Sequence, residues 1–209
     1  MKAIESLILE HQQMGHLADA LETYARRTRL GQLDDAPYLA EFAAVFTELG
    51  ECIHHEKEEG ILLPMLSRHG VRWDEGALPA VRREHRQEAY LIDVLRQAGE
   101  RCSSWSSEDR RYIAAAAQAL VEFQRGHHAL ETTQLFPLVE QRLSADELAA
   151  LHDALERFDL AHAERRDLVL QRLEALVLRY ASPAHSGVQA LLYGPSEPDG
   201  AERLLSRPR

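Results

Sequence analysis

The segment HHEKEEGILLP at residues 54–64 returns 73 residues later as HHALETTQLFP at residues 127–137. The two copies share a double histidine, a glutamate four residues after the first histidine, and a closing Leu-x-Pro. A second pair of segments repeats at an offset of 74, because EHQQ at residues 10–13 returns as EHRQ at residues 84–87. Such self-similarity is typical of a repeated structural unit, here of the form His…His-x-x-x-Glu.

Apolar residues recur at the i, i+3 and i+4 spacing of amphipathic helices along most of the chain, and no strand alternation stands out. In the first expected helix, His11 falls on the apolar face beside Leu7 and Met14. The sequence therefore predicts an all-α fold, an up-down four-helix bundle made of two pseudo-repeated helical hairpins. The closing Leu-x-Pro of each copy is expected to serve packing and helix termination.

Three segments are expected along the chain. Residues 1–143 form the four-helix bundle, residues 144–181 add a C-terminal helix packed on it, and residues 182–209 form an irregular tail. The added helix is predicted from the capping box Ser144-Ala145-Asp146-Glu147, which is followed by apolar residues at helical spacing. The tail is predicted from its proline, glycine and serine content.

The composition limits the classes of function. With 209 residues and a net charge of −10, the chain can bury a core, and its interspersed charges argue against a nucleic-acid surface. No apolar run has the length of a membrane span or the form of a signal peptide. Cys52 and Cys102 are expected to be reduced thiols without a redox role. We therefore expect a cytoplasmic protein that contacts neither nucleic acid nor membrane.

The spacing within each repeat lets its polar side chains meet. A histidine and a glutamate at positions i and i+4 project from one face of a helix, as His54 and Glu58 do. His11 and His54 each lie about 26 Å from the turn between their helices, at roughly 1.5 Å per residue, and the second hairpin matches to about 5 Å. We therefore predict one layer of six metal-binding side chains: His11, His54, Glu58, His85, His127 and Glu131.

Burying these groups in a core calls for a cation. Isolated buried carboxylates are unfavourable, and two like carboxylates in one layer repel each other unless a cation lies between them. Mixed imidazole and carboxylate ligands suit iron, manganese or zinc. We expect two iron ions bridged by an oxide or hydroxide, with manganese or zinc as alternatives, and a remaining open position for a small molecule.

The other histidines are expected to have surface, packing or capping roles, because a lone histidine on an apolar face is usually a packed residue. Successive residues of an α-helix point about 100° apart, so His54 and His55 are not expected to face the same core layer. Glu56 and Glu59 are expected on a solvated face. The remaining histidines are His16, His55, His69, His128, His152, His162 and His185.

Over about residues 1–140 the sequence resembles the hemerythrin-like, or HHE cation-binding, family. The resemblance implies a non-haem di-iron centre in a four-helix bundle that binds oxygen, nitric oxide or related oxidants. The oxygen-carrying members have five histidines and an aspartate, where this chain has Ala89 in the third helix and Thr132 in the fourth. The four-histidine, two-glutamate pattern is similar to bacterial iron-centre repair proteins, whose usual N-terminal cysteine segment is not found in this sequence.

We therefore expect a non-haem di-iron-binding protein that binds or responds to a small oxidant (oxygen, nitric oxide or peroxide) or handles iron. Two alternatives stay open. One is a di-iron redox enzyme that reduces peroxide or nitric oxide or repairs iron centres, and the other is a structural interaction bundle that holds zinc. The expected ligand is a small diatomic molecule or peroxide. No catalytic residue is predicted, and the sequence does not identify a protein partner.

Overall fold

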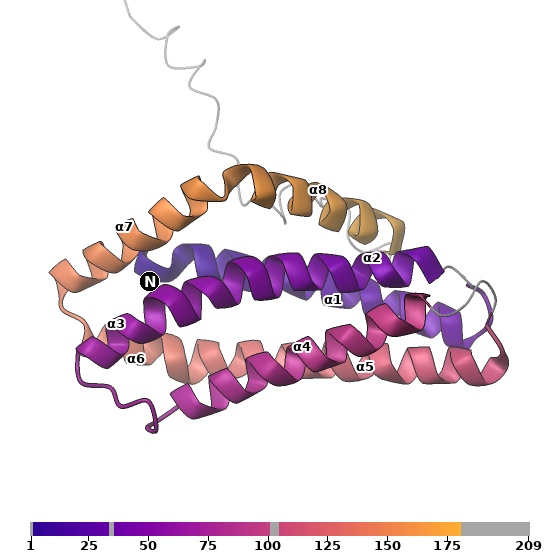
Figure 1. Ribbon diagram of the computed structural model, residues 1–209, viewed down its shortest axis with the longest axis horizontal. Coiled ribbons are helices and arrows are strands. Elements are labelled where there is room, and N and C mark those ends of the chain that lie inside the picture. The colour runs from indigo at the N-terminus through magenta and orange to yellow at the C-terminus, as the bar shows by residue number, and fades with distance from the viewer. Residues whose placement is uncertain (1, 34–35, 101–104, 181–209) are drawn as a thin grey trace, which may run out of the picture.

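The computed structural model describes residues 2–33, 36–100 and 105–180, and these residues are mostly helical, without a strand (Figure 1). The all-α fold predicted from the sequence is confirmed. Three short π-helical segments interrupt the α-helices. The elements are η1 Lys2–Ile4, α1 Glu5–Arg29, α2 Ala36–Phe46, η2 Thr47–His55, η3 Glu58–Leu62, α3 Leu63–Arg68, α4 Leu78–Glu100, α5 Ser107–Leu130, η4 Glu131–Leu135, α6 Phe136–Arg142, α7 Ala145–Ala161 and α8 Ala163–Tyr180.

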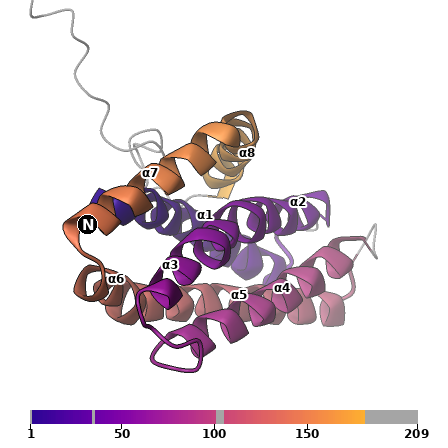
Figure 2. The same cartoon turned by 60° about the vertical axis from the view of Figure 1, so that its left-hand side comes forward.

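Four long helical rods form the bundle. The first is α1, the second runs from α2 through η2 and η3 into α3, the third is α4, and the fourth runs from α5 through η4 into α6. Along their lengths α1 packs against α5, and α2 packs against α4 (Figures 1 and 2). The chain therefore forms two hairpins that face each other, as the repeat predicts.

The prolines of the two Leu-x-Pro segments do not end their rods, which corrects the expectation of helix termination. Pro64 lies in the first turn of α3 and Pro137 in the first turn of α6. Each follows a π-helical segment, and the backbone stays helical on both sides of the proline. The second rod consequently continues to Arg68 and the fourth to Arg142.

The C-terminal segment contains two helices where one was expected. The capping box at its start is present, because Ser144 Oγ accepts from the backbone N–H of Glu147 and the Glu147 carboxylate accepts from that of Ser144. The helix then breaks at His162, whose φ and ψ are −113° and 15°. A single straight helix of this length would extend about 54 Å and leave the bundle surface. The break instead lets both halves follow it.

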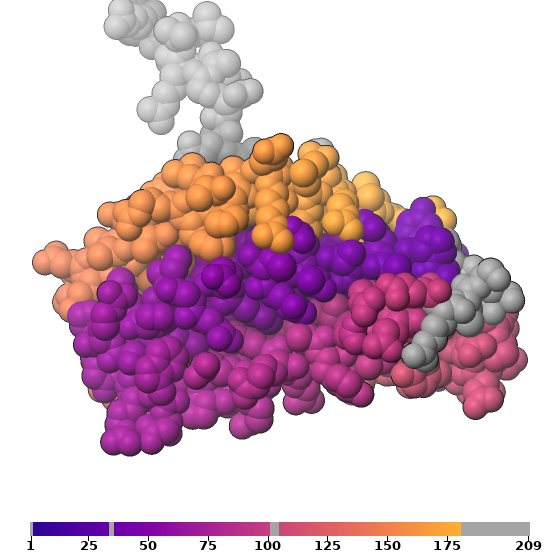
Figure 3. Space-filling view, in the orientation of Figure 1, coloured from indigo at the N-terminus to yellow at the C-terminus, as the bar shows by residue number. Residues whose placement is uncertain are grey.

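The two C-terminal helices lie along one long side of the bundle, meeting at an angle above α1 and α2 (Figures 1 and 3). Leu151 and Leu155 of α7 pack beside Ile4 at one end. Leu173 and Tyr180 of α8 pack at the other end against the first two rods. The tail predicted at residues 182–209 lies outside the described residues, and the division into three segments stays a prediction.

Two apolar clusters fill the bundle and leave a polar layer between them. The first includes Met14 and Phe46, and the second includes Leu7 and Leu62. Along each rod, the histidine predicted to bind metal lies between residues of the first cluster and residues of the second. His11, for example, lies between Leu7 and Met14. The polar layer is therefore enclosed by hydrocarbon above and below.

Among the described residues, no helix combines the length and apolarity needed to cross a membrane. The cytoplasmic location stays a prediction. Cys52 is a free, partly buried thiol, and Cys102 lies outside the described residues.

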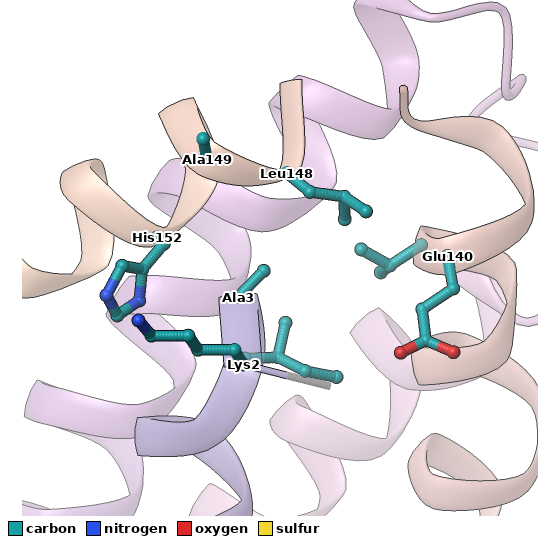
Figure 4. Close-up of a pocket in the computed structure, with 8 residues that line it drawn as sticks. Lys2, Ala3, Glu140, Leu148, Ala149 and His152 are labelled. Carbon is teal, nitrogen blue, oxygen red and sulfur yellow. The ribbon is translucent and has the colours of Figure 1, made fainter. Parts of the chain in front are cut away.

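A surface groove of about 330 Å³ lies between η1, α6 and α7 (Figure 4). Lys2 and His152 approach each other on one side of it, and Leu148 and Glu140 lie on the other. None of the six predicted metal-binding residues lines this groove.

Candidate metal centre

The structure brings the six predicted side chains together in the polar layer. They come from all four rods: α1 and α4 each supply one histidine, and the second and fourth rods each supply a histidine and a glutamate. All six are buried, with at most 9% of any one exposed. Their assignment as metal ligands stays a prediction. They are His11, His54, Glu58, His85, His127 and Glu131.

Glu58 faces histidines of both hairpins. Its Oε1 lies 3.7 Å from Nε2 of His54 in the first hairpin. Its Oε2 lies 3.2 Å from Nε2 of His85 in the second hairpin. One carboxylate thus directs one oxygen to each half of the layer.

Glu131 repeats this arrangement from the opposite side. Its Oε2 lies 2.9 Å from Nε2 of His11, and its Oε1 lies 3.2 Å from Nε2 of His127. The same Oε1 is 3.6 Å from Nε2 of His85. Each glutamate therefore directs one oxygen toward the histidines of each hairpin.

Several polar atoms that point into the layer lack hydrogen-bond partners among the described residues. Within the described residues, no hydrogen-bond partner satisfies Nε2 of His85 or His127, or either carboxylate oxygen of Glu58 or Glu131. Nε2 of His11 instead faces another imidazole nitrogen across 3.0 Å. Buried polar atoms are normally paired, so orphans that converge on one space fit a bound cation.

The first-helix glutamate of each repeat holds the second-helix histidine of the same hairpin. His54 donates from Nδ1 to Glu10 Oε2 at 3.0 Å. His127 donates from Nδ1 to Glu84 Oε2 at 3.1 Å. A carboxylate on Nδ1 fixes the ring so that Nε2 is presented to a metal. In the sequence, the recurring Glu-His pair is the feature that points to this role of Glu10 and Glu84.

Glu59 has a role that the sequence analysis missed. It was expected on a solvated face, and 41% of its side chain is exposed, yet its Oε1 accepts from His85 Nδ1 at 2.7 Å. Its counterpart in the second copy is Thr132, so the repeat provides no sign of this contact.

The expectation that His54 and His55 do not face the same core layer is wrong. His55 is 7% exposed, and its ring stacks on that of His85 with centroids 3.8 Å apart. Both histidines lie in the π-helical segment η2. In the second copy, His128 stacks on His11 in the same way, at 4.0 Å.

Alanine variants of His54 and His55 distinguish a proposed metal ligand from a residue that contributes packing. We expect His54→Ala to lose metal, because Nε2 of His54 faces the centre of the layer. We expect His55→Ala to keep metal and fold but to lose about 1–3 kcal/mol of stability with the stacked ring. Metal analysis and thermal melts of both variants check this.

A competing arrangement makes this pair of variants informative. Ring nitrogens of His55, His85 and His127 lie within 4.8 Å of one another, close enough to hold an ion. Metal loss in His55→Ala with retention in His54→Ala would assign the first-hairpin ligand to His55.

Burial keeps the imidazoles of the first hairpin neutral. The pKa of His54 is well below its usual range, first because burial disfavours the cation and then because neighbouring imidazoles repel it. Burial also lowers the pKa of His11. Neutral imidazole is the form that coordinates a metal.

The surroundings of the two glutamates shift their pKa values in opposite directions. Burial, reinforced by the charge of Glu58, raises the pKa of Glu131 to about 7. Burial also acts to raise the pKa of Glu58, but the neighbouring imidazoles of His85, His11 and His55 together outweigh it and lower the pKa to about 2. Two like carboxylates in one dry layer repel each other, and a cation between them reverses this repulsion.

The hemerythrin HHE cation binding domain matches residues 2–103. That range holds His11, His54, Glu58 and His85 of the layer. The chain contains a hemerythrin HHE cation-binding domain. The resemblance identified from the sequence is thereby confirmed, and cation binding is the property that this domain brings.

The whole fourth rod lies beyond the matched range, and it supplies the last two residues of the polar layer, His127 and Glu131. Their place follows from the internal repeat and from the bundle geometry.

Three curated relatives are similar to this chain, each 28% identical over 157 residues, which is 74% of this chain and 60% of the relative. They include "Uncharacterized protein Mb2018" of Mycobacterium bovis and "Uncharacterized protein Rv1995" of Mycobacterium tuberculosis. The matched region thus spans less than two thirds of the length of these relatives. No solved structure matches the chain significantly.

Proposed function

We propose that this HHE protein holds two iron ions between its hairpins and binds or responds to a small oxidant, such as oxygen, nitric oxide or peroxide, or handles iron. One observation carries the proposal. Glu58 and Glu131 each direct one oxygen toward the histidines of each hairpin, and these buried oxygens have no hydrogen-bond partner among the described residues.

The proposed ligand set divides evenly. His11 and His54 serve one ion, His85 and His127 serve the other, and both glutamates are shared. Ligand atoms of His11, His54, Glu58 and Glu131 lie within 4.8 Å of one another. Two nitrogens and two oxygens for each ion suit iron and leave room for a further ligand. A pair of iron ions, when bound, supplies redox chemistry and a position that accepts a small molecule.

The surrounding residues restrict the size of that molecule. His54, Glu58 and Glu131 are fully buried, and His11 keeps only 9% of its surface exposed. Apolar clusters close the layer on both sides. A diatomic molecule or peroxide fits such an enclosure, whereas a bulky organic substrate does not.

Metal analysis of protein purified from iron-replete cells tests the proposal. We expect about two iron ions per chain and visible absorption from the iron centre, because the layer offers two matched ligand sets. One ion per chain, or full occupancy by zinc, would contradict the di-iron assignment and favour a structural zinc bundle.

Exposure of the reduced protein to oxygen, nitric oxide and peroxide tests the ligand class. We expect a change in the iron absorption with at least one of them. Repeated turnover of peroxide or nitric oxide with a reductant would identify a redox enzyme instead of a binding or sensing protein.

A further inference from the structure

A lysine is completely buried beside the metal layer. Lys57 lies in the second rod between the two proposed ligands of that rod, and its side chain is 0% exposed. Its Nζ donates to Glu10 Oε1 at 2.5 Å, to Asp159 Oδ1 at 3.0 Å and to Ser6 Oγ at 3.3 Å. A buried ammonium is tolerated only where it is paired in this way.

The partner of this lysine is the carboxylate that holds a proposed metal ligand. Glu10 is 0% exposed and divides its oxygens, because Oε1 accepts from Lys57 while Oε2 accepts from Nδ1 of His54 at 3.0 Å. With one oxygen held by Lys57, the other is held on the ring of His54.

The C-terminal helices complete the arrangement. Asp159 belongs to α7 and Arg166 to α8, on either side of the break between these helices. Arg166 lies 3.3 Å from Asp159 Oδ1 and 3.7 Å from Glu10 Oε1. A continuous set of charged contacts thus joins α7 and α8 to His54.

The second hairpin is built differently at the equivalent place. Leu130 stands where the first copy has Lys57. Glu84, which holds His127, is 22% exposed and lies 3.9 Å from Arg83, itself 64% exposed. The buried contacts of Lys57 with Glu10 and Asp159 therefore belong to the first hairpin, and the two halves of the layer are not equivalent.

We propose that Lys57, Asp159 and Arg166 are positioning residues that hold Glu10 on His54, so that α7 and α8 set the affinity of the His11–His54 metal position. This inference rests on the proposed function. Outer partners of a metal-bound histidine fix its orientation, and their loss typically weakens metal binding by about 10–100-fold. The C-terminal helices are then part of the metal centre and not only a cover of the bundle.

Calorimetric titration of the full chain with Fe²⁺ under anaerobic conditions tests this role in two variants. Lys57→Met keeps the length of the side chain but removes the charge, and we expect it to weaken one of two binding events by about 10–100-fold. Asp159→Asn keeps the shape and removes the negative charge that faces Lys57 and Arg166, and we expect a smaller weakening of the same event.

Nuclear magnetic resonance of the Zn²⁺-loaded protein separates a local effect on His54 from a general loss of stability. A general loss of stability would change proton exchange at both His54 and His127. The Nδ1–H proton of His54 is expected to exchange faster with water in both variants. That of His127, held by Glu84, is expected to exchange as in the unaltered protein.

Arg172→Ala is the matched control. Arg172 also ties α8 to the bundle, through Glu41 at 2.6 Å, but it contacts no residue of the metal layer. We expect it to leave both Fe²⁺ affinities unchanged. Equal weakening in Arg172→Ala and Asp159→Asn would overturn the positioning role, because attachment of α8 alone would then explain the effect.

Unchanged affinities in folded Lys57→Met and Asp159→Asn would also overturn the inference while leaving the proposed function intact. If Lys57→Met does not fold, Asp159→Asn decides the question alone. Failure of the unaltered protein to bind a pair of metal ions would instead overturn the proposed function, and this inference with it.

Discussion

Glu131→Ala is expected to abolish the binding of both metal ions. Glu131 is fully buried, and its two oxygens lie 2.9 Å from Nε2 of His11 and 3.2 Å from Nε2 of His127. Its removal takes an oxygen ligand from each metal position at once. The affinity should fall by more than the roughly 100-fold that loss of an outer partner costs. Metal content of the purified variant measures this directly.

Glu58→Ala should behave in the same way, because Glu58 also faces both hairpins. Glu56→Ala is the matched control, since Glu56 lies on the same rod two residues earlier and is exposed. It should retain the metal content of the unaltered protein. Full occupancy of one position in Glu131→Ala would show that the glutamate does not bridge.

Removal of the metal is expected to lower the stability of the bundle strongly. Without a cation the layer holds orphaned carboxylates and imidazoles in a dry core. At a free metal concentration 1,000 times the Kd, each bound ion adds about 4 kcal/mol to the free energy of unfolding. For a domain of this size, that corresponds to roughly 10 °C in Tm for each ion. Thermal melts before and after chelation test it.

Acid should produce the same loss without a chelator. Imidazole must be neutral to coordinate, so protons compete with metal as the pH falls. Metal release and the fall in Tm should therefore occur together in an acid titration. Coincident melts of metal-free and metal-loaded protein would contradict a structural contribution of the metal.

Much of the bundle and of its polar layer was predictable because helices have fixed geometry. His54 and Glu58 share a face because they are four residues apart, and His11 reaches their height because both arms of the first hairpin are equally long. The repeat identified Glu10 and Glu84 as a matched pair, but only the structure shows that they hold His54 and His127.

The features that were missed depend on backbone bonding or on distant contacts. The ring of His55 enters the layer by stacking on His85 of another rod. The break at His162 occurs without a glycine or proline. Lys57 lies among the acidic residues 56–59, where nothing marks it as buried, and its partner Asp159 is 102 residues away. Periodicity describes one helix at a time, so it does not report such contacts.

X-ray absorption at the iron edge of the iron-loaded protein tests the central claim most directly. The claim is that Glu58 and Glu131 hold two ions side by side between the hairpins. We expect scattering from a second iron at roughly 3.5 Å, the separation typical of two-metal sites, together with imidazole scattering from the histidines. Iron surrounded only by nitrogen and oxygen ligands, with no second metal within about 5 Å, would contradict the shared-carboxylate centre.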